Sequence, residues 1–153
     1  MSELNELYKD LILDHNKSPR NYKKLENYNH KAEGFNPLCG DHYNLYLKLD
    51  NGVIKDIGFE GSGCAISKAS ASMMTSILKG KTKDEAEVLF KKFHKLLTSK
   101  IGEEQDTGGL GKLEVFAGVR DYPVRVKCAS LAWHTLKAAL QEKAGEEKTI
   151  STE

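Results

Sequence analysis

The residues best suited to chemistry lie in the stretch Pro37-Leu38-Cys39-Gly40-Asp41, which places a thiol and a carboxylate two positions apart. The intervening Gly40 can adopt backbone angles that a Cβ would forbid, so both side chains can turn toward one point. A thiolate and a carboxylate that meet in this way are metal ligands. An ordinary turn can have the same composition, so the interpretation as a metal site depends on where the other cysteines fall.

The second cysteine, Cys64, follows the glycine-rich stretch Gly61-Ser62-Gly63. Apolar residues then recur at helical spacing as far as Gly80, a typical helix stop. Cys64 therefore falls at a helix N-terminus, where unpaired amides and the helix dipole favour a thiolate over a thiol. The alternative is that Cys64 is only a small buried hydrophobic residue.

A β-hairpin is expected to bring Cys64 back toward Cys39. Apolar and polar residues alternate from Tyr43 to Asp50, which is the period of a half-buried strand. Asn51-Gly52 then turns the chain, and the return strand carries the apolar residues Val53, Ile57 and Phe59.

Two registers are open for this hairpin. A two-residue loop would pair Asp50 with Val53 and send the apolar residues of the two strands to opposite faces. A three-residue loop with Gly52 in the left-handed conformation would instead pair Leu49 with Val53 and gather them on one face. We prefer the second register because it builds a core.

Continued beyond the strand ends, the preferred register sets Asp41 opposite Gly61 and brings Cys64 back beside Cys39. Spacing cannot place the third cysteine, Cys128, which falls in or just before the first turn of the last predicted helix. Three cysteines and one aspartate form a Cys3Asp set, and such a tetrahedral set suits a borderline-soft ion such as zinc.

Helical periodicity predicts further elements around this site, with a Thr82-x-x-Glu85 capping box at the start of one helix. The predicted helices cover about residues 2–14, 65–79, 82–98 and 128–140. Residues 21–31 are interpreted as a surface loop and residues 99–111 as a surface loop or lid. We expect one domain over residues 1–144, followed by a frayed tail over 145–153.

The overall composition limits the functions that are open. The chain has 153 residues and a net charge of +1, which argues against a broad nucleic-acid or anionic-membrane surface. No apolar run is long enough to span a membrane and no signal peptide is apparent, so we expect a cytoplasmic protein. Three cysteines cannot all pair, and in a reducing compartment metal binding or catalysis is a more common use for them than disulfides.

Three segments resemble the signature blocks of the iron–sulfur assembly family that shares the NifU N-terminal fold. They are Pro37–Asp41, Gly61–Ser67 and Val124–Trp133, in that order. The resemblance runs from about Leu4 to Leu140. It implies an α+β fold in which a small antiparallel three-stranded sheet is packed on one side by helices.

The third block separates two branches of this family. The scaffold branch, the IscU type, carries a histidine directly before the third cysteine, whereas this chain has Lys127 there. The longer segment from about Ser99 to Arg120, together with Arg125 and Trp133, is similar to the SufU type. The resemblance therefore favours the SufU branch and leaves cluster ligation by a histidine in doubt.

The resemblance to the SufU branch implies a sulfurtransferase-type relay rather than a stand-alone catalyst. Zinc would be bound by Cys39, Asp41, Cys64 and Cys128. Cys39 would accept persulfide sulfur from a SufS-like cysteine desulfurase and pass it toward downstream iron–sulfur assembly proteins. Arg125 and Lys127 could stabilise negative charge on sulfur beside this site, although exposed cations are more often solvated surface charges.

Two alternatives remain open at this stage. The chain could be a scaffold on which iron or a transient [2Fe–2S] cluster is held by Cys39, Cys64 and Cys128. It could also be a structural zinc module, although structural zinc sites usually consist of Cys and His, which makes Asp41 an unusual ligand. His42, which follows Asp41, is interpreted as a strand-edge residue outside the site.

Overall fold

We describe the fold from a computed structural model, which covers residues 2–100, 103, 106–141 and 147–151. After the first helix, three consecutive strands are followed by consecutive helices, the segregated order that is usual for an α+β protein. The elements are α1 (Ser2–Lys17), β1 (His30–Asn36), β2 (Asp41–Asp50), β3 (Val53–Ser62), α2 (Ala65–Leu78), α3 (Lys83–Thr98), the 3-10 helix η1 (Gly111–Val119), α4 (Pro123–Gln141) and β4 (Glu147–Ser151).

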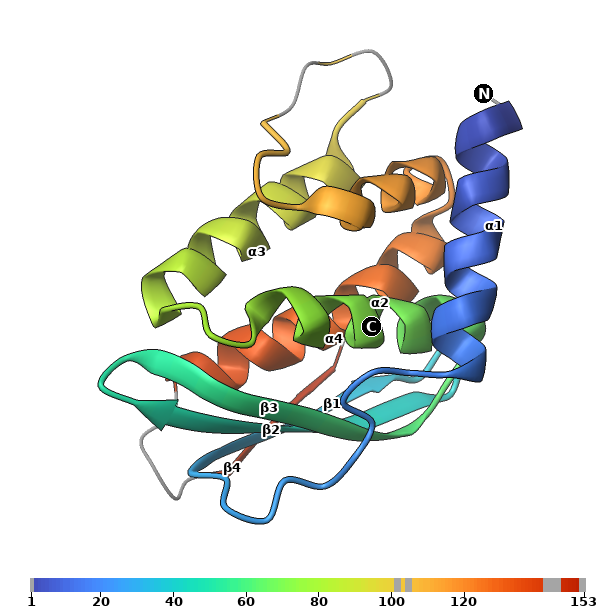
Figure 1. The fold of residues 1–153 in the computed structure, drawn as a ribbon. Coiled ribbons are helices and arrows are strands. Elements are labelled where there is room, and N and C mark those ends of the chain that lie inside the picture. Colours follow the sequence, from blue (N-terminus) through green and yellow to red (C-terminus); the bar gives the residue numbers. More distant parts are fainter. Residues whose placement is uncertain (1, 101–102, 104–105, 142–146, 152–153) are drawn as a thin grey trace.

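The helices cover one face of the sheet (Figure 1). Helices α2 and α4 pack directly on the strands, and α3 and η1 form an outer layer over α4. Helix α1 lies against α2 and η1. The core between the layers is built from fully buried side chains of both, which include Leu47, Ile57, Phe59, Phe93, Phe116, Trp133 and Leu136. The expected α+β fold with helices on one side of the sheet is confirmed.

The sheet has four strands in the order β3-β2-β1-β4, one more than expected. Strands β1, β2 and β3 are antiparallel, as predicted, and β4 adds parallel to β1. Residues 147–151 thus form an edge strand where the sequence predicts a frayed tail, because β1 offers unpaired backbone groups that an extended segment can satisfy. The other residues of that predicted tail, 145–146 and 152–153, lie outside the described part of the chain.

The predicted loop length of the hairpin is wrong, but the prediction that the apolar residues of both strands share one face is confirmed. Asn51 and Gly52 form a two-residue loop with positive φ angles of 51° and 76°, so Asp50 pairs with Val53. A β-bulge follows, because Lys55 is an extra residue between the Leu49–Ile54 and Lys48–Asp56 pairs.

The bulge restores the common face that the preferred register required. Beyond it, Leu47 pairs with Ile57 and Leu45 pairs with Phe59, and all four side chains are buried. The last pair is His42 with Ser62, so Asp41 lies opposite Gly63 and not opposite Gly61 as predicted.

The helix termini decide where the cysteines lie. Cys64 caps α2 and Thr82 begins α3 with the predicted capping box. Helix α4 begins at Pro123, a residue favoured in the first turn of a helix, so Cys128 lies in its second turn and not at its N-terminus as predicted. None of the helices in the described ranges is long and apolar enough to cross a lipid bilayer.

Candidate metal centre

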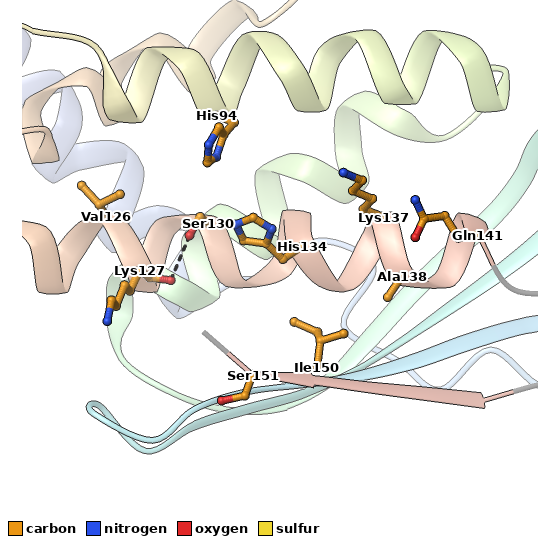
Figure 2. Close-up of a pocket in the computed structure, with 10 residues that line it drawn as sticks. All are labelled: His94, Val126, Lys127, Ser130, His134, Lys137, Ala138, Gln141, Ile150 and Ser151. Carbon is orange, nitrogen blue, oxygen red and sulfur yellow. Dashed lines mark hydrogen bonds between the residues drawn. The ribbon is translucent and has the colours of Figure 1, made fainter. Parts of the chain in front are cut away.

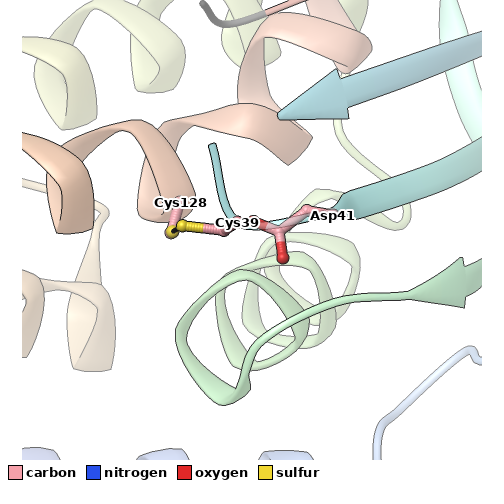
Figure 3. A group of neighbouring side chains, drawn as sticks. All are labelled: Cys39, Asp41 and Cys128. Carbon is pink, nitrogen blue, oxygen red and sulfur yellow. Dashed lines mark hydrogen bonds between the residues drawn. The ribbon is translucent and has the colours of Figure 1, made fainter. Parts of the chain in front are cut away.

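Cys39 and Cys128 lie in contact although they are far apart in the sequence (Figure 3). The Cys128 thiol donates a hydrogen bond to the Cys39 sulfur, with 3.1 Å between the two Sγ atoms. Cys39 is half-buried in the loop between β1 and β2, whereas Cys128 is only 3% exposed on α4. The predicted convergence of Cys128 on the site is therefore present in the structure.

Asp41, the first residue of β2, lies beside this pair and is 1% exposed. Its Oδ1 accepts a hydrogen bond from the Cys64 backbone amide at 2.8 Å, and its Oδ2 lies 4.0 Å from the Cys64 sulfur. The sulfur atoms of Cys39 and Cys128 and a carboxylate oxygen of Asp41 all lie within 4.8 Å of one another. Since Oδ1 already accepts a short hydrogen bond, Oδ2 is the oxygen better placed to serve as a ligand.

Cys64 borders this three-residue group from the N-terminus of α2. Its sulfur accepts a hydrogen bond from the Ser67 amide at 3.4 Å, which is the N-cap interaction of the helix. The Ser67 hydroxyl lies 3.6 Å from the same sulfur and 2.9 Å from the Tyr43 hydroxyl. Residues from α2 and β2 thus hold the Cys64 side chain in place.

The crossing of α2 and α4 explains how Cys128 reaches the other donors. The two helices pack against each other, and both carry small buried residues, which allow close approach of helix backbones: Ser67, Ser70 and Ala71 on α2, and Ala129 and Ala132 on α4. The buried Ser70 hydroxyl donates a 2.6 Å hydrogen bond to the Ala129 carbonyl, one residue beyond Cys128. This contact fixes the helix that carries Cys128 to the helix that begins after Cys64.

Asn36 is a site residue that the sequence reasoning missed. It is fully buried at the end of β1, and its amide Nδ2 donates to the Cys128 sulfur at 3.5 Å and, over 3.4 Å, to Asp41 Oδ2. Its Oδ1 has no hydrogen-bond partner among the described residues. The only sequence signal was its position directly before Pro37, which is equally typical of a turn.

The pKa values of the Cys64 and Cys128 thiols are shifted in opposite directions. The neighbouring Cys128 thiol, supported by hydrogen bonds with Ser67, lowers the pKa of Cys64 to about 6 although burial opposes the shift. The neighbouring Cys64 sulfur, burial and the hydrogen bond with Cys39 all raise the pKa of Cys128. The pair therefore retains a proton on Cys128 and carries a thiolate at Cys64 at neutral pH.

The donor set fits a borderline-soft divalent cation such as zinc. Asp41 is buried, yet it forms no ion pair with any lysine, arginine or histidine in the described ranges, which is costly for a carboxylate unless a cation is present. Thiols and carboxylate oxygens are ligand types that zinc takes in tetrahedral sites, and the Cys64 sulfur lies next to the three grouped donors. Asn36, in turn, would orient the carboxylate from outside this ligand set.

Four other residues of the signature blocks or next to them lie elsewhere. Arg125 is exposed and stacks over the Tyr122 ring at 4.6 Å. Trp133 is buried in the core. His42 lies in the inner strand β2, not at an edge of the sheet, and its ring stacks on Phe35 of β1. Lys127 lines a cavity of about 470 Å³ between α3, α4 and β4, together with residues such as His134 (Figure 2). A role of Arg125 or Lys127 beside the sulfurs stays a prediction.

Comparison with known proteins matches residues 7–129 to the NifU-like N-terminal domain. The zinc-dependent sulfurtransferase SufU of Bacillus subtilis is 41% identical over 144 residues, which cover 94% of this chain and 96% of that protein. The iron–sulfur cluster assembly scaffold protein IscU of Streptococcus pyogenes is 40% identical over 94% of this chain and 89% of its own.

Solved structures agree with this assignment. A putative iron–sulfur cluster assembly scaffold protein for the SUF system from Fervidobacterium islandicum superposes with a TM-score of 0.81 at 40% identity, over 89% of this chain and 98% of that one. A NifU-like protein (N-terminal) from Brucella abortus gives a TM-score of 0.79 at 26% identity, over 90% and 94%. With its three cysteines and one aspartate gathered at the end of the sheet, the chain belongs to the NifU-like N-terminal domain family of iron–sulfur cluster assembly proteins.

Proposed function

We propose that this protein is a zinc-binding sulfur acceptor, which takes persulfide sulfur from a cysteine desulfurase and relays it toward iron–sulfur cluster assembly. Zinc would be held by Cys39, Asp41, Cys64 and Cys128. When bound, zinc keeps thiols deprotonated and adds no redox chemistry of its own. The similarity to a relative named as a zinc-dependent sulfurtransferase supports this choice of metal and activity.

The observation that carries the proposal is the unequal attachment of the four donors. Asp41, Cys64 and Cys128 lie at the start of β2, at the cap of α2 and within α4. Cys39 lies in a short loop next to Gly40, which has a φ of 71° and open space around it. Cys39 can therefore leave the donor set by moving its loop, while the other three stay in place.

Sulfur transfer needs only that movement and a partner persulfide. The Cys39 thiolate attacks the terminal sulfur of the persulfide on the desulfurase cysteine. A new sulfur–sulfur bond forms on Cys39, the bond to the partner cysteine breaks, and that cysteine leaves as a thiolate, so no external oxidant or reductant is consumed. Asp41, Cys64 and Cys128 would retain the metal meanwhile.

The surroundings of the site offer apolar surface to a partner. Leu38, beside Cys39, is 62% exposed, and Tyr122 and Val124 at the start of α4 are each 51% exposed. Exposed apolar residues near a reactive group are typical of a protein-docking surface. This supports a protein as the sulfur donor.

A Cys39→Ala variant tests the proposal. With the zinc-loaded protein, a cysteine desulfurase and cysteine, we expect the variant to lose stimulation of alanine release and to gain no added sulfur by mass spectrometry. Unchanged zinc content and an unchanged melting temperature would show that the loss is chemical, whereas unfolding of the variant would favour a structural zinc module. Full stimulation by Cys39→Ala would overturn the proposal.

A second candidate function is that of a scaffold for a [2Fe–2S] cluster, favoured by the relatives named as IscU scaffolds. The same Cys39, Cys64 and Cys128 would ligate the iron. Anaerobic reconstitution of the zinc-free protein should then give a stable chromophore that can be transferred to an acceptor protein. A protein that fails to retain iron under these conditions is not a scaffold of this kind.

A further inference from the structure

A separate cavity of about 400 Å³ lies away from the sulfurs, between α1, α2 and the start of η1. Its charged and polar lining includes His15 from α1, Arg20 just after it, and Lys112 from η1, and no carboxylate of the described residues lines it. The apolar side chains of Met73 and Ile77 on α2 also line it. The cavity therefore combines donors and positive charge with an apolar wall.

His15 is a nearly buried imidazole in the lining of this cavity. It is 7% exposed, and its Nδ1 lies 2.7 Å from the Ser72 hydroxyl. The Arg20 backbone amide donates to that same hydroxyl at 2.8 Å. The hydroxyl keeps a second lone pair and its own proton, so it can pair with either tautomer of the imidazole. In the tautomer whose Nδ1 accepts the Ser72 proton, the ring proton is on Nε2, and no described residue forms a hydrogen bond with that nitrogen.

Arg20 and Lys112 act on the same imidazole. Burial is the main cause that lowers the pKa of His15, and the charges of Arg20 and Lys112 lower it further. Asp14 offsets part of this positive charge through its 2.7 Å ion pair with Arg20, but it does not line the cavity. Lys112 has no ion pair within the described residues, so a net positive charge remains at the cavity.

The backbone adds donors at the same place. The segment Gly108-Gly109-Leu110-Gly111-Lys112 leads into η1, with positive φ angles of 89° at Gly109 and 56° at Gly111. A right-handed residue followed by a left-handed one, here Leu110 and Gly111, turns successive amides toward one side, an arrangement that binds anions. The amides of Gly111 and Lys112 have no acceptor in the described part of the chain, as is usual for the first turn of a helix.

We propose that this cavity binds a small organic phosphate, with the phosphate at His15, Arg20, Lys112 and the start of η1, and the organic part against Met73 and Ile77. Phosphate suits the site better than a carboxylate because it has three terminal oxygens and a charge near −2 for this many donors. The volume is of the class that holds organic ligands and exceeds the need of inorganic phosphate alone.

The test uses the zinc-loaded full-length chain and phenyl phosphate as the probe, with inorganic phosphate and phenol as its two halves. Titration followed by amide NMR should shift the signals of Gly111 and Lys112, with phenyl phosphate binding more tightly than either half. The proposal would be overturned if phenol bound as tightly as phenyl phosphate. It would also be overturned if the shifted NMR signals were confined to residues around Cys39.

Two variants test the charged residues. Arg20→Gln with Lys112→Gln should weaken binding at least about tenfold, because two charge-assisted contacts are lost. Lys112→Gln alone should weaken binding about threefold to fivefold. This variant should fold like the parent, because Lys112 is exposed and makes no side-chain hydrogen bond within the described chain. The control, Lys91→Gln with Lys95→Gln on α3, removes the same charge from an exposed helix face and should bind like the parent. Equal affinity of the Lys112→Gln variant and the parent would exclude this site.

Discussion

The loop that carries Cys39 and the elements that carry Asp41, Cys64 and Cys128 meet at one point but are held very differently. The loop is short, bordered by exposed residues and turned by Gly40. The other three donors sit on a strand start, a helix cap and a buried helix turn, joined by hydrogen bonds through Asn36, Ser67 and the Cys64 amide.

This difference suggests separate roles, in which the three anchored donors hold a metal and Cys39 on its loop reacts. A donor fixed by secondary structure loses little conformational entropy when it binds a cation, whereas a loop donor must be ordered at that moment. The anchored side should therefore dominate metal affinity. The loop side should dominate reactivity, and changes to the two sides can test this division.

The largest expected effect follows from removing an anchored ligand. Cys128→Ala should weaken zinc binding by about 100- to 1000-fold, since one of four ligands accounts for roughly a quarter of the ~10–16 kcal/mol typical of structural zinc. Cys39→Ala should cost only about tenfold, because water can take the open position, as in catalytic zinc sites. Competition with a chelator measures both. Equal losses for the two variants would remove the distinction between loop and anchored donors.

Two glycines extend the same contrast to the backbone. In Gly63→Ala the new Cβ would lie 2.6 Å from Asp41 Oδ1, Ser67 Oγ and Tyr43 OH, so we expect a loss of about 2–3 kcal/mol in unfolding free energy. Gly40→Ala on the loop meets nothing within 4 Å and should cost about 1 kcal/mol, from its φ of 71° alone. Urea denaturation of both variants gives the comparison, and a Gly40 variant less stable than the Gly63 variant would contradict it.

Asn36 should have a smaller effect, and only on the anchored side. Asn36→Ala removes the donor to Asp41 and Cys128, and we expect about tenfold weaker zinc binding, as for other residues that orient metal ligands. Desulfurase stimulation at saturating zinc should stay near the parent level because Cys39 is untouched. A variant that binds zinc normally would show that Asn36 only fills space.

The smallest effect is a titration in the metal-free protein. The lowered pKa of Cys64 means that a thiolate is present above about pH 6 and is protonated below it. Thiolate absorbance should therefore fall as the pH is lowered from 7 to 5, and the step should be absent in Cys64→Ala. Cys39→Ala should retain the step, and its loss there would place the thiolate on the loop instead.

Much of this architecture could be predicted from the sequence because it depends on local patterns. The amphipathic helices and the one-faced hairpin follow from the periodicity of apolar residues, and the capping box follows from the Thr82-x-x-Glu85 pattern. Pro37–Asp41 and the glycines before Cys64 indicated two donors at one end of that hairpin. The resemblance to a family with three signature blocks then supplied Cys128, which no local spacing could position.

The parts that escaped prediction depend on contacts between distant segments. The bulge at Lys55 cannot be read from the hairpin alone, because it compensates for the two-residue turn only once the core is formed. Strand β4 exists through its pairing with β1. Asn36 acquires its role from Cys128, a residue on another element, so its own neighbours in the sequence carry no sign of it.

The placement of the four donors also has a consequence for how the protein matures. Only Cys39 and Asp41 are close in sequence, so a newly made chain has no ready chelate, and the full ligand set exists only after α2 and α4 have crossed. The large apolar core between helices and sheet contains none of the four donors. We therefore expect the fold to form before the metal is bound, the reverse of the order in a zinc finger.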